Sequence, residues 1–464
     1  MPSAAELSAL GNAAIVAPAG HGKTEVIAGV AALGCRSLIL THTHAGVHAI
    51  RSRLKRLGIS HFAVSVDTIA GWCMRYAHAF PGIAQPPSGM PRGPEWTQLY
   101  RGTILALGVA AIRDVVSSSY DRILIDEYQD CDVLQHELAT TLASIVPTVI
   151  FGDPMQGIFE FAGATLSWAG QIHPQFPLAG SLDIPYRWQG KNPELGAWIA
   201  ETRQRLMVGE PIDLESGPII YRSSNNAFDM GTFFDGIDAR EGTQAAIHCN
   251  RALCNRLAQA TRGGFQAIEE MAASRLQSFA TDWDSSPDQA RRLAVVKALI
   301  NDCFHIKKRL PDEDGDQEDD SLGHEMNIIA HNLGDSDGII AARQLFSLAR
   351  RRSRWRLFRG EIWRDGERAM SEIASGRVST MMDATAIIRQ RITNTGRRLP
   401  TRTISTPLLL KGLEFDHVVI PDATHFGGER FAHAKLFYVA ISRATRSLTI
   451  SSSERFLQFP VPKI

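Results

Sequence analysis

An eight-residue segment near the N-terminus combines small residues with a lysine and a threonine. Residues 17–24 read APAGHGKT and lie between an apolar run at 13–16 and a helical pattern that starts near Glu25. Small side chains let consecutive backbone N–H groups approach phosphate oxygens at the positive end of the following helix, while the lysine adds a charge and the threonine hydroxyl can bind Mg²⁺. The segment therefore predicts a nucleoside triphosphate site. Its candidate residues are Ala17, Ala19, Gly20, Gly22, Lys23 and Thr24.

A pair of adjacent carboxylates at the end of an apolar run is the second candidate. Residues 123–130 read ILIDEYQD, so the run brings Asp126 and Glu127 to one edge of a predicted sheet. There Asp126 can bind Mg²⁺ through its water shell, and Glu127 can polarise an attacking water. Paired acids after a strand can also be helix N-caps, which is the alternative interpretation.

The elements that must position these residues follow a regular alternation. Short β-rich runs alternate with longer helical patterns between residue 11 and about 190, which predicts an α/β fold with a parallel sheet covered by helices. Phosphate sites in such folds lie at the carboxyl ends of the strands, where both candidates occur. The predicted strands are 13–16, 36–41, 62–66, 122–126 and 148–153, with further strand-like runs at 245–249 and 417–421.

Composition narrows the class of protein. The 464 residues are 44% hydrophobic, enough for two or three cores, and the N-terminus lacks the pattern of a secretory signal. We expect a cytoplasmic protein without membrane segments. The six cysteines include no C-x-x-C pair, which favours buried thiols over a zinc site. Lysine plus arginine and aspartate plus glutamate both total 49, so any DNA-binding surface must come from local patches.

Five motifs in a fixed order identify a family resemblance. They are LIDEYQD at 124–130, GDPMQGIFEFAGA at 152–164, PYR at 185–187, KGLEFD at 411–416 and YVAISRA at 438–444. With the phosphate-binding loop, they resemble the motif set of UvrD/Rep/PcrA-type superfamily 1A DNA helicases. Among these, the chain looks closest to compact UvrD-like proteins such as the helicase-like subunit of the Gabija anti-phage system.

The resemblance implies two RecA-like P-loop NTPase domains with parallel sheets and a mostly helical insertion. The first domain is expected at 1–190, with a small insertion at about 75–118. The second is expected at 191–260 and 401–464. A helical subdomain is expected to occupy 261–400.

The resemblance also implies roles for individual residues, with ATP and Mg²⁺ as cofactors. Thr24 and Asp126 would bind the metal ion, and Glu127 would activate water. Gln156 would sense the γ-phosphate, and Arg187 and Arg443 would reach it as well. The expected catalytic residues are Lys23, Asp126, Glu127, Gln156, Arg187 and Arg443.

Base and DNA contacts are implied in the same way. Tyr186 would stack on adenine, and Glu414 would accept a hydrogen bond from the ribose. Hydroxyls and backbone groups at two strand ends would contact the single-strand backbone, and two aromatic side chains would stack on bases. The expected DNA-binding residues are Thr41, His42, Asp67, Thr68, Phe159 and Phe161. Alternating aromatic residues after a strand can also be core residues.

Charge blocks occur within 261–400. Residues 312–320 contain seven acids in nine positions, typical of a solvated loop, with a metal- or partner-binding segment as the alternative. Nine arginines occur between 343 and 368, interleaved with Trp355, Phe358 and Trp363. Arginines with aromatics suit nucleic-acid binding. They equally suit a solvated helix face that pairs with nearby acids.

The sequence thus predicts a DNA-dependent ATPase or helicase that moves along single-stranded or partly duplex DNA, with 3′→5′ polarity by resemblance, in DNA repair or anti-phage defence. Residues 1–12 lack the glutamine with which the family reads adenine, so the resemblance does not extend to base selectivity. Ala162 stands where the family commonly has an arginine, and Leu408 replaces the usual histidine. These two replacements and the compact insertion support an alternative: an ATP-hydrolysing DNA sensor that controls a partner nuclease without substantial unwinding.

Overall fold

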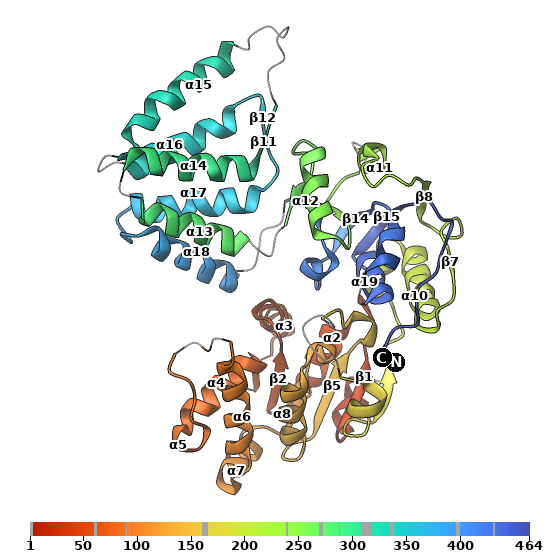
Figure 1. Ribbon diagram of the computed structural model, residues 1–464. Helices are drawn as coiled ribbons and strands as arrows, with labels where there is room; N and C mark the ends of the chain where they lie inside the picture. The colour runs from red at the N-terminus through yellow and green to blue at the C-terminus, as the bar shows by residue number, and fades with distance from the viewer. Residues whose placement is uncertain are drawn as a thin grey trace. The chain divides into compact units, whose positions relative to one another are not determined.

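The structure is a computed structural model in which the chain forms two compact units (Figure 1). It describes residues 3–59, 63–89, 91, 93–159, 166–237, 240–268, 272–286, 288–307, 317–334, 338–395, 400–429 and 432–464. The first unit comprises Met1–Ile220, Phe426–Ser447 and Glu454–Ile464, and the second comprises Tyr221–His425 and Leu448–Ser453.

A six-stranded sheet in the order β3-β2-β4-β5-β1-β6 forms the centre of the first unit. All neighbouring strands run parallel, so their carboxyl ends meet at one edge. Strand β1, which leads into the phosphate-binding loop, lies directly beside β5. The strands are β1 (Ala13–Val16), β2 (Ser37–Thr41), β3 (Val64–Thr68), β4 (Arg122–Ile125), β5 (Thr148–Gly152) and β6 (Leu178–Ser181).

Helices cover both faces of this sheet because successive strand residues point to opposite faces. Ile123 and Ile125 of β4 pack in one hydrophobic cluster with α4, α6, α7 and α8. Leu124, between them, packs in the other cluster with α1, α2 and α3. These helices are α1 (Ala4–Ala9), α2 (Lys23–Ala31), α3 (His44–Arg56), α4 (Ile69–Ala79), α6 (Glu95–Leu107), α7 (Ala110–Ser119) and α8 (Val133–Ala143).

Two of the remaining helices of the first unit come from distant parts of the chain. α10 packs against both α9 and α19 although more than 200 residues separate it from α19. The elements are α5 (Pro81–Ala84), α9 (Tyr186–Gln189), α10 (Pro193–Val208) and α19 (His433–Ile441), with the antiparallel pair β7 (Ile212–Asp213) and β16 (Phe456–Leu457).

A second six-stranded sheet has the order β10-β13-β9-β14-β15-β8. The pairs β10–β13, β13–β9 and β9–β14 are parallel. The strands are β8 (Ile220–Ser223), β9 (Gln244–Ile247), β10 (Gln266–Ala267), β13 (Arg402–Ser405), β14 (Phe415–Ile420) and β15 (Ala444–Ser452), with helices α11 (Met230–Phe234) and α12 (Arg251–Ala260).

Residues 272–395 of the second unit are mostly helical, as the sequence predicts. They share a hydrophobic core in which the Phe346 and Trp363 rings stack with centroids 3.9 Å apart. The elements are α13 (Ala272–Asp284), α14 (Gln289–Cys303), α15 (Gln317–Ala330), α16 (Gly338–Arg351), α17 (Gly360–Ala374), α18 (Met381–Thr395) and the antiparallel pair β11 (Phe304–Ile306) and β12 (Trp355–Leu357).

The arginine-rich block contributes to this core and to ion pairs. Trp363 is buried in this core, whereas Phe358 is buried in the separate hydrophobic cluster that includes α12 and β9. Arg352 donates to the buried Asp319 from Nη2 at 2.7 Å and from Nε at 2.9 Å. At these positions the structure favours pairing with nearby acids. Residues 312–316 of the acidic block lie outside the described residues.

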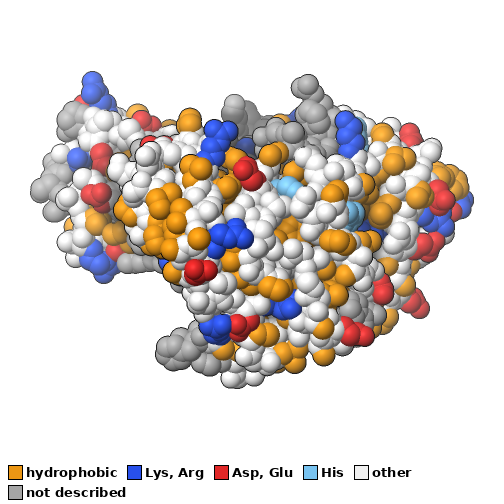
Figure 2. Space-filling view, turned by 90° about the horizontal axis from the view of Figure 1, so that it is seen from below, with side chains coloured by type: hydrophobic (Ala, Val, Ile, Leu, Met, Phe, Trp, Pro, Cys, Tyr) orange, Lys and Arg blue, Asp and Glu red, His pale blue; other side chains and the backbone are white. Residues whose placement is uncertain are grey.

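Two parallel-stranded sheets with covering helices confirm the predicted α/β fold class. The expected strands at 13–16, 36–41, 122–126 and 148–153 are present within one residue of those bounds. The bounds of the two RecA-like domains and the insertion stay a prediction. On the face drawn in Figure 2, positive and negative side chains are interspersed among the described residues, in line with the zero net charge.

Candidate nucleotide-binding site

The predicted phosphate-binding loop joins β1 to α2 and needs its glycines. Gly20 and Gly22 have φ values of +75° and +79°, a region that side chains with a Cβ rarely adopt. A Cβ on Gly22 would lie 2.9 Å from the Tyr186 ring, and one on Gly20 would lie 2.7 Å from Trp188. The loop therefore packs closely against the segment that begins α9.

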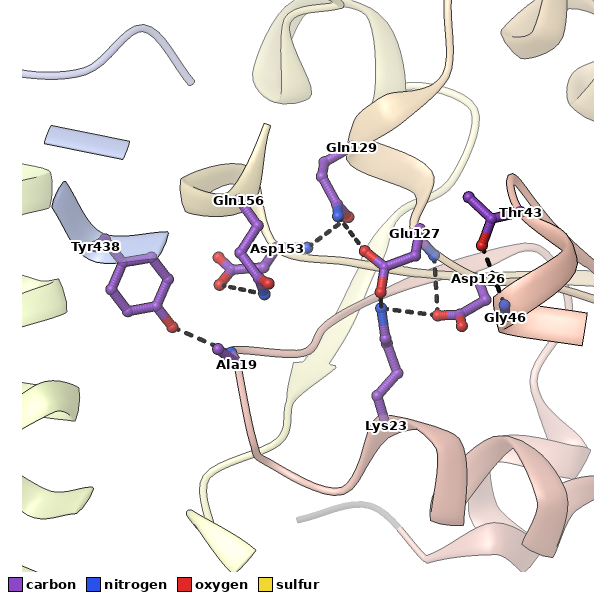
Figure 3. Close-up of polar contacts among 10 residues, drawn as sticks. All are labelled: Ala19, Lys23, Thr43, Gly46, Asp126, Glu127, Gln129, Asp153, Gln156 and Tyr438. Atoms are coloured by element: carbon purple, nitrogen blue, oxygen red, sulfur yellow. Dashed lines mark hydrogen bonds and ion pairs between the residues drawn. The ribbon is translucent and has the colours of Figure 1, made fainter. Parts of the chain in front are cut away.

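Lys23, the first residue of α2, lies against both predicted acids (Figure 3). Its Nζ is 2.8 Å from Asp126 Oδ1 and also pairs with Glu127 Oε1. Burial alone would lower the pKa of Lys23, but the charges of Asp126 and Glu127 outweigh it and raise the pKa. The lysine thus stays charged at the sheet edge.

Asp126 and Glu127 form ion pairs with Lys23, and neither side chain caps a helix. Glu127 precedes the 3-10 turn Tyr128–Asp130, but its side chain makes no capping hydrogen bond there. The first α-helix after β4 is α8, and its N-cap is Asp132, whose side chain accepts from the Gln135 N–H. Asp126 instead accepts from the Glu127 N–H at 2.9 Å, and burial raises its pKa against the opposing charge of Lys23. Carboxylate and hydroxyl oxygens are the donors that Mg²⁺ prefers, so Asp126 and Thr24 fit the predicted metal ion.

Gln156 lies in the turn that follows β5. Its Nε2 donates to Asp153 Oδ2 at 3.1 Å, and Asp153 accepts from Arg203 of α10 at 2.7 Å. Asp153 is 0% exposed. Gln156 is thereby held by a buried ion pair directly beside β1.

Arg187 and Arg443 both belong to the first unit. Arg187 donates to the Ser442 carbonyl at 2.6 Å, and its backbone N–H donates to Gly20 O in the phosphate-binding loop. Arg443 is buried and donates to Val439 O and Ser442 Oγ. The structure thus brings the PYR and YVAISRA motifs together beside the loop, although about 250 residues separate them.

Comparisons with known proteins agree with this geometry. Residues 95–177 match the UvrD/REP helicase N-terminal domain, and residues 405–451 match the UvrD-like helicase C-terminal domain. The first range contains both acids and Gln156, and the second contains Arg443. Two segments of the chain are thus similar to UvrD-like superfamily 1 helicases.

One curated relative matches a shorter stretch of this UvrD-like chain. Over 81 residues, 17% of the chain, it is 30% identical to RecBCD enzyme subunit RecB of Buchnera aphidicola subsp. Schizaphis graminum (strain Sg). The match spans 7% of that protein. Among the described residues of the UvrD-like chain, every helix is too short or too polar to cross a bilayer.

The predicted DNA-binding residues of this UvrD-like protein lie at strand ends and beyond. Thr41 ends β2 and is buried, and no protein group pairs with its hydroxyl among the described residues. His42 Nε2 lies 3.5 Å from Cys131 Sγ. Asp67 pairs with Arg75, and Thr68 is the N-cap of α4.

The remaining predicted site residues are placed as follows. Tyr186 is 45% exposed, with its ring over Gly22, and Phe159 is 38% exposed. Glu414 is exposed and belongs to the second unit. Phe161 lies outside the described residues. No described group of three or more His, Cys, Asp or Glu side chains is arranged to hold a metal ion alone.

Two functional candidates were missed from the sequence. Apart from its place in the YVAISRA motif, nothing in the sequence indicates a role for Tyr438. In the structure its hydroxyl accepts a hydrogen bond from the Ala19 N–H at 3.1 Å. Arg203 is one of four charged residues in α10, and only the fold shows that it binds Asp153. Their partners are 419 and 50 residues away, beyond the reach of local patterns.

Proposed function

We propose that this chain is a DNA-dependent ATPase that hydrolyses ATP at the Lys23, Asp126 and Glu127 cluster and moves along single-stranded DNA. The observation that carries the proposal is Lys23 Nζ held 2.8 Å from Asp126, beside a phosphate-binding loop, in a chain with UvrD-like domains. The direction 3′→5′ follows from the family resemblance.

Each residue has a distinct part in the proposed reaction. The loop amides and Lys23 bind the phosphates. Glu127 orients the attacking water and accepts its proton. Thr24 and Asp126 would hold Mg²⁺, which neutralises charge on the phosphates when bound. Arg187 lies beside the loop and can balance negative charge that develops on the γ-phosphate.

The test compares two lysine substitutions. Lys23→Ala removes the charge that binds the phosphates and should abolish DNA-stimulated ATP hydrolysis. Lys55→Ala, at an exposed position of α3, is the matched control and should leave the rate unchanged. Full DNA-stimulated activity in the Lys23→Ala protein would show that the active site lies elsewhere.

A regulatory role is the second candidate. The matched relative is named as a subunit of an enzyme, which favours a chain that works with a partner. In this version the chain hydrolyses ATP on DNA and controls a partner nuclease with little unwinding. A strand-displacement assay separates the two: ATP hydrolysis without displaced strand supports the sensor, and ATP-dependent displacement supports the helicase.

We further propose that the chain acts in DNA repair or anti-phage defence, where single-stranded DNA arises. Purification of the tagged protein from its native source tests for a partner subunit. A nuclease that copurifies in constant ratio supports the regulatory version. Recovery of the chain alone, with helicase activity, supports the autonomous enzyme.

A further inference from the structure

A series of contacts connects the two ends of the proposed catalytic site through groups that the proposed reaction does not use. Figure 3 draws its members other than Arg203. The series starts at Glu127, whose carboxylate accepts from Gln129 Nε2. Gln129 Oε1 in turn accepts from the Asp153 N–H at 3.0 Å. Asp153 binds Arg203 Nη2 at 2.7 Å and Nε at 3.3 Å. The carboxylate that would activate water is thus linked to α10.

From α10 the contacts return to the phosphate-binding loop. The Arg203 guanidinium lies 6.0 Å from the ring centroid of Tyr438 in α19. The Tyr438 hydroxyl accepts from the Ala19 N–H at 3.1 Å, and both residues are buried. Lys23, at the other end of the same loop, pairs with Glu127. All of these residues lie in the first unit.

Burial makes these contacts costly to break. The Arg203 side chain is 6% exposed and Asp153 is not exposed at all, so neither charge can be solvated if its partner is removed. Burial raises the pKa of Tyr438, as does the charge of Asp153, so the phenol keeps its proton. A protonated hydroxyl can accept from Ala19 and still direct its own hydrogen elsewhere.

We propose that Arg203 and Tyr438 are positioning residues for ATP hydrolysis. Tyr438 fixes the Ala19 amide, and Arg203 fixes Asp153, which holds Gln156 at 3.1 Å. Together they keep the phosphate-binding loop and the Gln156 turn in one fixed arrangement, so that no reorganisation is needed in the transition state. This inference rests on the proposed ATPase function.

The sharpest test removes a single oxygen atom. Tyr438→Phe keeps the ring but leaves the Ala19 N–H without its acceptor. We expect kcat for DNA-stimulated ATP hydrolysis to fall about tenfold while KM for ATP changes less than about twofold, because the loss concerns the transition state more than binding. Tyr100→Phe is the matched control: it also loses one buried hydroxyl, which accepts from Gln135 at 3.1 Å, and should keep the wild-type kcat.

A second substitution tests whether the residues act as a unit. Arg203→Lys retains a charge for Asp153 but cannot reproduce the planar contacts of the guanidinium. We expect a reduced kcat, and we expect the double variant with Tyr438→Phe to lose less than the product of the two single losses. Unchanged kcat in Tyr438→Phe, or fully multiplicative losses, would overturn the inference.

The outcomes separate this inference from the proposed function. If the wild-type rate does not depend on Lys23, the proposed function fails. If the rate depends on Lys23 but Tyr438→Phe matches wild type at temperatures where both are folded, only the positioning role fails. A lower melting temperature in Tyr438→Phe with unchanged kcat would assign the hydroxyl a purely structural role.

Discussion

Glu127 holds a backbone conformation that residues other than glycine rarely adopt. Its φ is +56°, and such conformations cost about 1–3 kcal/mol and concentrate at functional sites. The cost is offset by two contacts of its carboxylate, with Lys23 and with Gln129. The strained backbone turns Glu127 towards the phosphate-binding loop, two residues after β4 ends at Ile125.

Replacement of this carboxylate should separate hydrolysis from binding. Glu127→Gln keeps the size of the side chain and one acceptor oxygen but cannot accept a proton. We expect the DNA-stimulated ATPase rate to fall by about 10²–10⁴, the usual contribution of a general base, with ATP binding retained. Steady-state kinetics and nucleotide binding at equilibrium measure the two effects, with Glu137→Gln on the exposed side of α8 as control. A Glu127→Gln enzyme with wild-type kcat would exclude this residue as the base.

The sequence predicted the positions of those site residues that come directly after a predicted strand. The proximity of Lys23 to Asp126 was predictable because both follow buried parallel strands of one sheet. Arg203 was not, since an arginine in the middle of an amphipathic helix looks like a solvated one. Its role depends on the buried Asp153, which only the packing of α10 reveals.

Along helix α10, two arginines only two residues apart differ in environment. Arg203 pairs with a fully buried Asp153, whereas Arg205 pairs with Glu201 on the exposed side. We expect Arg203→Met to lower the free energy of unfolding of the first unit by about 3–5 kcal/mol, because it leaves a buried charge without a partner. Arg205→Met should cost about 0.5 kcal/mol or less. Urea denaturation followed by a probe in the first unit compares them, and equal losses would contradict the argument.

The carboxyl ends of β9 and β14 carry a histidine pair in the second unit. His248 Nε2 lies 2.8 Å from His425 Nδ1, and its own Nδ1 accepts from the Asn250 N–H. Burial and the neighbouring His425 lower the pKa of His248 to about 4, while Asp422 opposes the shift. His248 is therefore neutral in the folded chain at neutral pH.

This pair predicts a pH dependence of stability. Between about pH 6.5 and 4 the unfolded chain binds a proton at His248 that the folded chain does not, so stability falls as pH falls through that window. The His248→Gln variant has no titrating group at this position, so its free energy of unfolding should lack this pH-dependent loss. The difference in free energy of unfolding between wild type and the variant should therefore become smaller as the pH falls. Urea unfolding from pH 7.5 to 5 measures the difference, with the exposed His78→Gln as control. A difference that stays constant with pH would rule out the neutral folded histidine.

At the level of elements, the sequence predicted strands well where they are apolar, but not where they contain polar residues. Strands β4 and β5 are buried and apolar throughout, apart from Arg122 and Thr148 at their starts. Strand β15 is also almost entirely buried, but its residues 449–452 include three serines or threonines. Hydroxyl side chains can be buried within a sheet when their backbone is paired, and they give no apolar pattern to find.

At the scale of the whole molecule, the sequence predicted two parallel-stranded sheets, and the structure has them. Local sequence patterns could not predict which C-terminal segments pack in the same compact unit as the N-terminal residues. Residues 426–447 belong to the same compact unit as the phosphate-binding loop, and the hydrogen bond from Ala19 to Tyr438 joins them. Loop closure over such distances is specified by packing rather than by propensity.

Whether ATP hydrolysis drives movement along DNA or only DNA sensing depends on the whole chain. The dependence of the ATPase rate on the length of the DNA distinguishes these two functions. A protein that moves along a strand and leaves at its end spends a larger share of its cycle hydrolysing ATP on longer strands. We therefore expect the ATPase rate at saturating ATP and equal nucleotide concentration to rise with the length of single-stranded DNA and then level off. Steady-state assays on homopolymers of increasing length measure this, with Lys23→Ala as the background. A rate that is independent of length, once the strand exceeds the binding site, would contradict movement and leave the sensor as the function of this UvrD-like chain.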